Sequence, residues 1–546
     1  MSYSILSTIF FIAWFVRFVE RVLFHVYEWQ LKEYRWDRYR AYLNTRQGVW
    51  QVLNPWYWLG PLYFYWLYFF GDWSDITMNG AMIVVASSEA YVIISGIFVL
   101  YTIATKGLRR PDLTGRAVLV TALSLLIGLP IVITQFSYFE GIITYLPFFI
   151  TTIFTPIGSL IVAPIFVALL VFLSSFPANY FKRRTIEKAK AKMASLPNLK
   201  VIGITGSYGK SSTKEFLATI LSAKYKVCKT PANRNSEIGV AQTVLREIKS
   251  EHEVFIVEMG AYRKGEIKAI CDIVHPTIGV LTAVSAQHLA LFGSFEETKK
   301  AKYELIEALP ENGIAIFNVD NRATRELAEQ TLKPKKLYSI ERPANIFATA
   351  ITVQPEKLSF SLVIGEAKQH IVVPLLGAQA VSSLLAAITV AHALGMTLEE
   401  IANATKEITP LDHTLKPYHH TSGALIIDDA YSANPDGVLA ALNHLKLIPR
   451  KYKVLVMMPM IELGSAGKDA HRKVGERIGE VCDLTIFTQK NFFGITRKAS
   501  KLPDQKFIFL SSPKAILNAL TPYLNENSVI LLENRISNTV LKSLLQ

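Results

Sequence analysis

Cysteine is scarce in this chain, with three residues among 546, namely Cys228, Cys271 and Cys482. So few cysteines, so widely spaced, provide neither a disulfide framework nor a zinc-ligand set. Acidic residues are also in deficit, 44 against 58 basic residues, which leaves a net charge of +14. No nucleic-acid-binding signature accompanies this charge, so we expect no nucleic acid partner. We interpret the basic excess as charge that flanks membrane helices.

Polar residues are sparse over the first 180 positions of a chain that is 51% hydrophobic overall. A helix of about 20 apolar residues is long enough to cross a bilayer. Candidate spans are residues 4–27, 52–71, 80–104, 117–136 and 142–176. The sequence therefore predicts a transmembrane helical domain over residues 1–180, with four or five spans.

Two of these candidates leave alternatives open. The first contains Arg17 and Arg21, so it is either a span or an amphipathic helix that lies in the membrane interface. The last contains Pro147, Pro156 and Pro164, so it is either one kinked span or a re-entrant segment followed by a span.

The distribution of basic residues predicts the orientation of the chain. Lys and Arg gather after the first and third candidate spans and in a basic linker at residues 181–198, whereas residues 72–75 and 135–140 contain none. Basic loops stay on the cytoplasmic side of a membrane. We therefore expect a multi-pass protein of the cytoplasmic membrane, with membrane lipids as partners and everything after the linker in the cytoplasm.

From residue 199 onward, short β-rich runs alternate with helical segments, a pattern typical of parallel α/β folds. We predict strands at residues 200–205, 254–257, 278–283 and 313–319. A second block of the same kind begins near Asp412. We therefore predict a P-loop α/β central domain at residues 199–411 and a Rossmann-like α/β domain at residues 412–546.

A glycine-rich loop follows the first predicted strand of the central domain. Its backbone curls so that several N–H groups face one anion, at the N-terminus of the next helix. Lys210 is expected to reach the β- and γ-phosphates of ATP, and the Ser211 hydroxyl is expected to bind Mg²⁺. The spacing departs from the general Walker pattern, because Ile204 stands where a glycine is usual. The residues predicted to contact ATP here are Gly206, Ser207, Gly209, Lys210, Ser211 and Ser212.

A series of motifs in one order resembles the Mur ligase family, and within it the MurF type. The resemblance covers roughly residues 199–546. The motifs are Thr205–Glu215, Thr230–Gly239, Val257–Gly260, His288–Ser294, Ala301–Leu305, Asn318–Asn321, Asp428–Pro435 and Ile461–Gly464 followed by His471.

The resemblance implies a site for two Mg²⁺ ions. Glu258 ends a predicted strand beside the phosphate loop, where a carboxylate can bind the metal. His288 resembles the family's second-metal histidine. Lys302 resembles the lysine that becomes carbamylated, which turns a cation into an oxygen ligand for the second ion. Lys210, Lys302 and His288 are thus the expected catalytic residues, and Ser211, Glu258, His288 and Lys302 the expected metal ligands.

The resemblance also assigns the nucleotide and the substrates. Asn318 and Asp320 resemble the residues that contact adenine and ribose. Asp429, Tyr431 and Asn434 lie where the C-terminal domain is expected to face an acyl phosphate and the incoming amine.

The sequence departs from the family pattern in several places. Gln379 and Ser383 stand at the polar positions of the element that usually reads Gly-x-His-x-x-x-Asn. His413-Thr414 stands at the usual Gly-Arg hinge, and Met458-Pro459 replaces a Gly-Asp pair. The predicted membrane helices stand where a soluble MurF carries a domain that binds a UDP-sugar.

The favoured function is an ATP-dependent amide ligase of cell-wall precursor synthesis. A precursor carboxylate takes up the γ-phosphate of ATP, and an amine, with D-alanyl-D-alanine favoured, then displaces the phosphate. Three alternatives remain, namely a Mur-like ligase that acts on a lipid-linked intermediate, an ATP-driven transporter, and a non-catalytic membrane scaffold that binds nucleotide. Other cell-wall enzymes are conceivable partners.

Overall fold

The computed structural model describes residues 3–44, 48–49, 93–94, 96–104, 108–127, 145–285, 294–355, 357–430, 433–460, 463 and 466–545. The chain divides into two compact units, Met1–Arg183 and Arg184–Gln546. The predicted span at 52–71, most of that at 80–104 and part of that at 117–136 lie outside the described residues.

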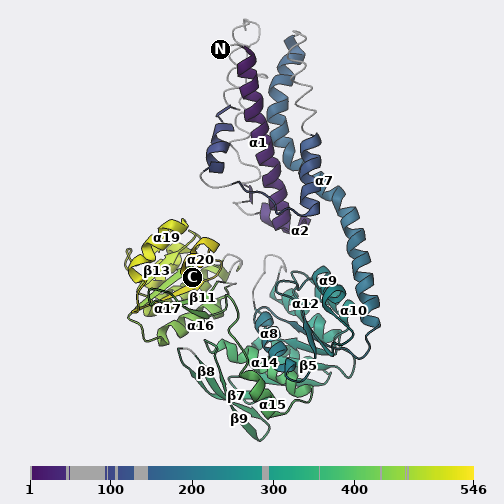
Figure 1. The fold of residues 1–546 in the computed structure, drawn as a ribbon, viewed down its shortest axis with the longest axis vertical. Coiled ribbons are helices and arrows are strands. Elements are labelled where there is room, and N and C mark those ends of the chain that lie inside the picture. Colours follow the sequence, from purple (N-terminus) through teal and green to yellow (C-terminus); the bar gives the residue numbers. More distant parts are fainter. Residues whose placement is uncertain are drawn as a thin grey trace. The chain divides into compact units, whose positions relative to one another are not determined.

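The described residues of the first unit are mainly helical (Figure 1). It contains α1 (Tyr3–Leu31), α2 (Trp36–Leu43), a shorter apolar helix at Gly115–Ile127 and the first part of α7 (Tyr145–Ala194). Its core joins residues of these helices such as Val22, Trp29, Val120 and Val167. Arg17, Arg21 and Glu28 of α1 are buried charged residues.

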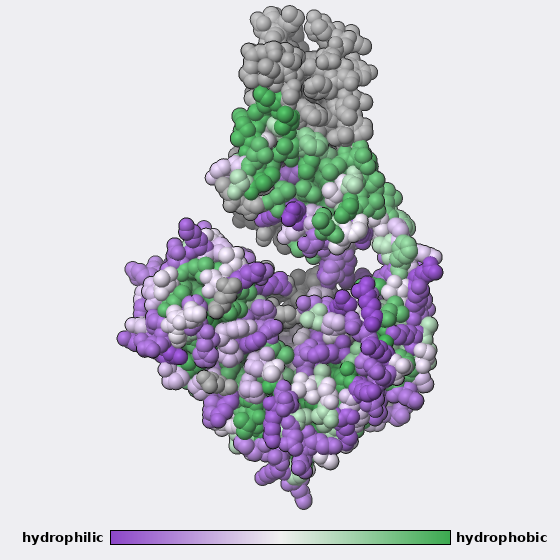
Figure 2. Space-filling model, viewed as in Figure 1, coloured by the Kyte–Doolittle hydropathy of each residue, from purple (hydrophilic) through white to green (hydrophobic). Residues whose placement is uncertain are grey.

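Apolar side chains also cover much of the surface of this helical unit (Figure 2). Phe98, Leu126 and Phe172 are examples, each about 60% exposed. Among the described residues, one helical stretch, Ala163–Ala194, is long and apolar enough to cross a membrane. The transmembrane domain with four or five spans therefore stays a prediction.

The helix α7 runs without interruption for 50 residues. It passes through Pro147, Pro156 and Pro164, so this segment forms one helix and does not divide into a re-entrant segment and a span. The predicted basic linker is helical as far as Ala194. Its last turns pack into the α/β unit through the buried residues Ile186, Ala189 and Met193.

Lys192 fastens this end of α7 to the α/β unit. Its ammonium donates hydrogen bonds to the backbone oxygens of Leu245, at 3.1 Å, and Ile248, at 2.7 Å. A buried lysine aliphatic chain with a hydrogen-bonded head group is a stable anchor. The basic linker is thus structurally part of the domain that follows it.

A nine-stranded sheet forms the centre of the first α/β domain, in the order β2-β3-β1-β4-β5-β6-β7-β8-β9. The pairs from β2 to β7 are parallel, and β7, β8 and β9 are antiparallel. The strands are β1 (Lys200–Thr205), β2 (Val227–Lys229), β3 (Val254–Glu258), β4 (Ile278–Leu281), β5 (Ile314–Asn318), β6 (Lys335–Ser339), β7 (Ile346–Val353), β8 (Leu358–Ile364) and β9 (Ala367–Val373).

Helices cover both faces of this sheet, which explains why its central strands are continuous apolar runs. One core joins the sheet to α8, α14 and α15, and the other joins it to α9, α10, α12, α13 and the end of α7. The helices are α8 (Lys210–Ser222), α9 (Glu237–Glu247), α10 (Glu266–Val274), α12 (Phe295–Glu307), α13 (Arg322–Gln330), α14 (Gln379–Ala393) and α15 (Leu398–Thr405). Because the chain order reverses between β1 and β4, the carboxyl ends of these strands form the crevice where such folds bind ligands.

A six-stranded sheet, in the order β10-β11-β15-β12-β13-β14, forms the C-terminal domain. Only β10 is antiparallel to its neighbour. The strands are β10 (Lys416–His419), β11 (Leu425–Asp429), β12 (Tyr452–Met457), β13 (Leu484–Phe487), β14 (Phe507–Phe509) and β15 (Ser528–Glu533). The helices are α16 (Pro435–Leu447), α17 (Gly467–Val481), α18 (Phe493–Ser500), α19 (Pro513–Leu520) and α20 (Asn538–Leu544), with a 3₁₀ turn at Thr521–Tyr523. The two predicted α/β domains are thus both present.

Candidate active site

The glycine-rich loop lies between β1 and α8, at the crevice. Gly206 and Gly209 both have positive φ angles, of 153° and 79°. A Cβ atom at Gly206 would lie 2.0 Å from Oγ1 of Thr282, so only glycine fits between the loop and the end of β4. The Ser207 N–H donates to the oxygen of Ala283 at 2.7 Å, and the Thr282 hydroxyl donates to the oxygen of Tyr208 at 2.5 Å. The loop is therefore held in its curled form by residues that follow β4.

Lys210 begins α8 and folds back over the loop. Its ammonium donates to the backbone oxygens of Gly206, at 2.8 Å, and Ser207, at 3.2 Å. Burial lowers the pKa of Lys210, and the carboxylate of Glu258 offsets this effect only in part. The ammonium thus rests where a phosphate group bound by the loop would meet it.

Glu258, at the end of β3, contacts polar groups from two segments, the helix α8 and the loop before α9. The Ser211 hydroxyl and the Asn235 amide donate to its Oε1 at 3.0 and 3.2 Å. Lys214 forms an ion pair with its Oε2 at 3.2 Å. Burial alone would raise the pKa of Glu258, but Lys214, Lys210 and the Asn235 hydrogen bond together hold it below its usual value. Glu258 is therefore an anion at neutral pH.

The donor set of Ser211 and Glu258 suits Mg²⁺, which prefers oxygen ligands and keeps several waters and phosphate oxygens in its shell. Among the residues that the structure describes, no three His, Cys, Asp or Glu side chains gather as a preformed metal site. A metal ion here would thus need phosphate oxygens to complete its coordination. His288 lies outside the described residues, so its predicted role is not addressed by the structure.

Lys302 is buried on α12, with 4% of its surface exposed. Burial, followed by the nearby charge of Lys210, lowers its pKa to about 7. Its amine makes no hydrogen bond to any residue in the described part of the chain. A lysine that is partly neutral at physiological pH is nucleophilic, which is the property that carbamylation by CO₂ requires.

Asn318 and Asp320, predicted to contact the nucleotide, are both hydrogen-bonded within the domain. The Asn318 amide donates to the hydroxyl of Ser382 on α14 at 3.3 Å. The Asp320 carboxylate accepts from the hydroxyl of Ser339 and, at 2.7 Å, from the N–H of Ile340. The Asp320 contacts tie the ends of β5 and β6 together, and the Asn318 contact ties the end of β5 to α14.

Sequence reasoning missed several residues that build this site. Asn321 caps α13, and its side chain also bonds both backbone groups of Val284 after β4, at 3.1 and 3.3 Å. Its amide also hydrogen-bonds to Tyr208 in the phosphate loop. Ser383 places its hydroxyl 3.3 Å from where a Cβ of Gly209 would lie. Asn321 lies in the Asn318–Asn321 motif, but only the fold shows which segments it joins.

The C-terminal residues predicted to face the substrates lie at the carboxyl edge of the second sheet. Asp429 is the last residue of β11. The Asn434 side chain accepts a hydrogen bond from the N–H of Gly437 at 3.0 Å and so caps α16. Tyr431 lies outside the described residues.

The structure also shows the contacts of residues that depart from the expected motifs and of His471 near them. His413, at the expected hinge, bonds the buried Asp428 through Nδ1 at 2.6 Å. The buried Oε1 of Gln379 has no hydrogen-bond partner among the described residues. His471 accepts a hydrogen bond from the N–H of Met460 on Nε2, so its Nδ1 carries the proton that it donates to the oxygen of Gly467. His471 is therefore a neutral residue that fixes the loop after Met458.

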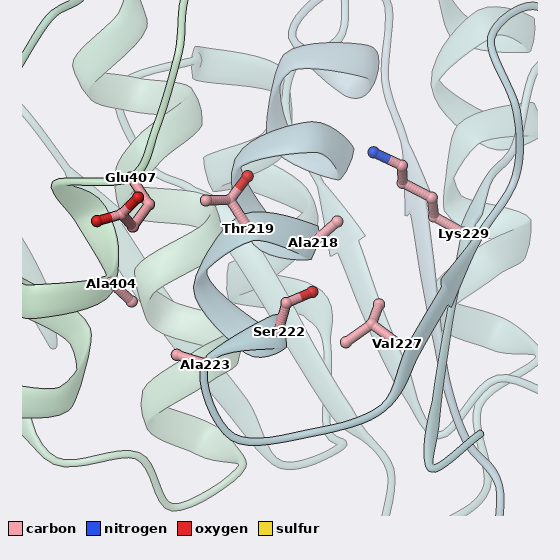
Figure 3. A pocket seen from close by; sticks show the side chains of 8 residues that line it. All are labelled: Ala218, Thr219, Ser222, Ala223, Val227, Lys229, Ala404 and Glu407. Atoms are coloured by element: carbon pink, nitrogen blue, oxygen red, sulfur yellow. The ribbon is translucent and has the colours of Figure 1, made fainter. Parts of the chain in front are cut away.

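A cavity of about 480 Å³ lies elsewhere in the same domain. It is lined by Ala218, Thr219 and Ser222 of α8 and by Ala223, Val227, Lys229, Ala404 and Glu407. Lys229 and Glu407 stand on opposite sides of it (Figure 3). Ala218 is about 12 Å along the helix axis from Lys210, at 1.5 Å per residue, so this cavity is separate from the phosphate loop.

The fold and the loop define the class of protein. A glycine loop between a buried parallel strand and a helix, with a lysine over it and a serine–glutamate pair beside it, is a site for a nucleoside triphosphate and its metal. A second α/β domain follows it. The two domains match the family descriptions "Mur ligase middle domain", at residues 204–391, and "Mur ligase, glutamate ligase domain", at residues 416–533.

Named relatives agree with these matches. The UDP-N-acetylmuramoyl-tripeptide–D-alanyl-D-alanine ligase of Buchnera aphidicola subsp. Baizongia pistaciae is 30% identical over 67% of this chain and 80% of the relative. That of Escherichia coli K12 is 33% identical over 51% of this chain and 61% of the relative. The chain thus spans less than two thirds of the Escherichia coli enzyme. The chain belongs to the Mur ligase family, and its similarity is to the MurF type.

Solved structures show the same likeness. MurF from Acinetobacter baumannii superposes with a TM-score of 0.59 at 26% identity, over 66% of this chain and 79% of that one. MurF from Thermotoga maritima in complex with ADP superposes with a TM-score of 0.60 at 25% identity, over 66% and 82%.

Proposed function

We propose that this chain is an ATP-dependent amide ligase of the MurF type that acts in peptidoglycan precursor synthesis. The observation that carries the proposal is the arrangement of Lys210, Ser211 and Glu258 around the glycine loop. Relatives named as UDP-N-acetylmuramoyl-tripeptide–D-alanyl-D-alanine ligases support it, as does the ADP complex of a structural neighbour. The carboxylate substrate is a muramoyl peptide precursor, and the amine is D-alanyl-D-alanine.

The chain's own residues account for the first step. The N–H groups of the loop and the start of α8 bind the ATP phosphates. Lys210 exchanges its bonds to the loop oxygens for bonds to phosphate and neutralises charge as the substrate carboxylate attacks the γ-phosphate. The products of this step are an acyl phosphate and ADP, and the amine then attacks the acyl carbon and releases phosphate.

Two Mg²⁺ ions belong to this proposal. Ser211 and Glu258 would hold one, and Lys302 in carbamylated form, with His288, would hold the second. The ions supply Lewis-acid charge neutralisation at the phosphates. Lys302 is suited to this role because its buried amine has a pKa of about 7.

We also propose that the helical unit is a membrane domain and that the catalytic domains lie in the cytoplasm. Its exposed apolar surface and the apolar stretch Ala163–Ala194 support this assignment. Lys182, Arg183 and Arg184 follow the apolar part of α7, as expected on the cytoplasmic side. This unit lies outside the residues that match the Mur ligase domains, so a lipid-linked precursor is the second candidate for the carboxylate substrate of a membrane-anchored ligase.

The test uses the full chain in detergent with ATP, Mg²⁺ and D-alanyl-D-alanine. A nucleotide-linked and a lipid-linked muramoyl tripeptide are offered in parallel, and the product is identified by mass spectrometry. Phosphate release that requires both carboxylate and amine is the expected result. Lys210→Ala should lose it, and the exposed Lys357→Ala of the same domain should keep it. Phosphate release at the same rate with and without the carboxylate and the amine would instead support a transporter or a nucleotide-binding scaffold.

A further inference from the structure

The cavity beside α8 has a volume of about 480 Å³, which is the size of a site for a small molecule. Two of its lining residues, Ala218 and Ala404, are buried, whereas Ser222, Lys229 and Glu407 are exposed to solvent. A ligand can therefore enter this cavity from solvent and still contact buried side chains.

Small side chains keep this space open. The helices α8 and α15 belong to the core on one face of the sheet, and each presents an alanine to the cavity, Ala218 and Ala404. Ala223, directly after α8, is a third alanine in the lining. A ligand with methyl-sized apolar groups would bury them against these walls, which is favourable.

The strand β2 places a cation at one side of the cavity. Val227 and Lys229 are two residues apart, so their side chains lie on one face of β2, and Cys228 between them is buried in the core of the opposite face. The Lys229 ammonium forms an ion pair with Glu215 of α8. This pair fixes the direction of a long side chain in advance, so less conformational entropy is lost when a ligand binds to it.

Glu407 places an anion at the opposite side of the cavity (Figure 3). It lies just after α15, and its N–H donates to the oxygen of Ala404 at 3.2 Å, which fixes the turn. Its carboxylate makes no hydrogen bond or ion pair to any residue that the structure describes, so it is available to a cation on a ligand.

The two charges define the chemical class of the ligand. A simple anion would be attracted by Lys229 and repelled by Glu407, and a simple cation would meet the reverse. A molecule with a carboxylate at one end and an ammonium group at the other satisfies both residues. The Ser222 hydroxyl lies between the two charged side chains and can form a hydrogen bond with the peptide group of such a molecule.

A chain of ion pairs leads from the cavity to the carboxylate of Glu258. Lys229 pairs with Glu215, and Glu215 pairs with Lys214 at 3.3 Å. Lys214 in turn pairs with Glu258 at 3.2 Å. Because Lys214 is 1% exposed, dissolved ions screen its two ion pairs only weakly. Lys214 thus divides its charge between a residue that bonds the cavity lysine and the residue proposed to hold Mg²⁺.

We propose that this cavity is a regulatory site for a small zwitterion of dipeptide size, whose carboxylate pairs with Lys229 and whose ammonium group pairs with Glu407. The bound carboxylate shares Lys229 with Glu215, so Glu215 attracts Lys214 more strongly. Lys214 then pairs less with Glu258, and Glu258 binds Mg²⁺ and its nucleotide more tightly. This inference goes beyond the proposed ligase function, because the ligand is not consumed.

The first experiment measures binding without nucleotide, so its result does not depend on the ligase function. The probe is L-alanyl-L-alanine, which is not the proposed amine substrate, and its binding to the full chain in detergent is measured by calorimetry. N-acetyl-L-alanyl-L-alanine lacks the ammonium group, and L-alanyl-L-alanine amide lacks the carboxylate. Each of these two probes should bind at least about tenfold more weakly than the zwitterion. Equal affinity for all three probes would overturn the proposal.

Variants locate this binding in the cavity. Lys229→Met and Glu407→Gln each remove one charge, and Ala404→Leu fills part of the space, so each should lower the affinity for the dipeptide at least about tenfold. Lys226→Met and Glu366→Gln are the matched controls, because both residues are exposed in the same domain and neither lines the cavity. A wild-type chain that does not bind the dipeptide would overturn the proposal, and so would binding that both charge variants leave unchanged.

The second experiment measures the coupling between the cavity and Glu258. A saturating concentration of L-alanyl-L-alanine should raise the affinity of the wild-type chain for ADP with Mg²⁺ at least about fivefold, and ADP with Mg²⁺ should raise the affinity for the dipeptide by the same factor. Lys214→Met should still bind the dipeptide and should lose this coupling, because it interrupts the chain of ion pairs outside the cavity. An unchanged or lowered nucleotide affinity in the wild type, or full coupling in Lys214→Met, would overturn the regulatory site.

Discussion

Gly206→Ala tests how closely the phosphate loop is fitted to the end of β4. The new Cβ would lie 2.0 Å from Oγ1 of Thr282 and 3.0 Å from the nitrogen of Ala283. A carbon and an oxygen usually approach no closer than about 3.3 Å, so the loop must move by about 1.3 Å. The φ angle of 153° is unfavourable for alanine as well. Crowding of this kind costs about 1–3 kcal/mol, and a positive φ angle adds about 1–2 kcal/mol.

The assay is the binding of ATP and ADP to the full chain by calorimetry. To bind a phosphate, the variant loop must return to the wild-type conformation, which costs this strain energy of about 2–5 kcal/mol. The affinity for ATP and ADP should therefore fall about thirtyfold or more. Gly365→Ala is the control, since it also has a positive φ, of 59°, but no atom lies within 4 Å of its Cβ. It should leave nucleotide binding unchanged.

A second variant separates the collision from the backbone strain. Thr282→Ala removes the nearest colliding atom, so the double variant should recover part of the affinity that Gly206→Ala loses. Nucleotide affinity within threefold of the wild type in Gly206→Ala would refute the reasoning. Equal losses in the single and double variants would show that the backbone angle alone is responsible.

Four further predictions follow from other parts of the structure. Lys302→Ala should lose amide formation and recover it in part when acetate is added, because acetate can supply the missing carboxylate oxygens. The assay measures the amide product, and unchanged nucleotide binding is the control. Lys214→Met should raise the pKa of Glu258, so Mg²⁺-dependent nucleotide binding should weaken as the pH falls towards about 5, where the wild-type carboxylate stays ionised. Lys192→Met should speed hydrogen exchange at residues 245–248, because hydrogen bonds from a charged group contribute about 1.5–3 kcal/mol. A reporter fused after the last residue should be active only in the cytoplasm, and activity on the outer side would contradict the proposed topology.

The sequence predicted the parallel core of the fold well, because buried parallel strands are short apolar runs bounded by turn residues. The predicted strand at Lys200–Thr205 is β1, and the one at residues 254–257 is β3 without its last residue. The antiparallel strands β7, β8 and β9 were missed. Their side chains alternate between exposed and buried with many polar residues, and they pair at the edge of the sheet, so no continuous apolar run marks them.

The site was predictable only where it is local in sequence. The glycine loop, Lys210 and Ser211 lie within a few residues, and backbone rules identify their role directly. Thr282 could not be found in that way, because its hydroxyl holds the phosphate loop through the oxygen of Tyr208, 74 positions away, and only the sheet brings the two residues together. A threonine after an apolar strand has no evident role until that strand is known to lie beside β1.

The unbroken helix α7 has a consequence for any change of its length. Its 50 residues extend for about 75 Å, and its last turns are locked into the α/β core by Ile186, Ala189 and Met193. A single residue inserted after Tyr180 would lengthen the helix by about 1.5 Å and rotate the turns just before it by about 100° relative to the turns that follow. An insertion of seven residues would restore the helical phase to within about 20°. The phase of the turns just before Tyr180, relative to the turns that Ile186, Ala189 and Met193 hold in the core, is therefore set by residue count.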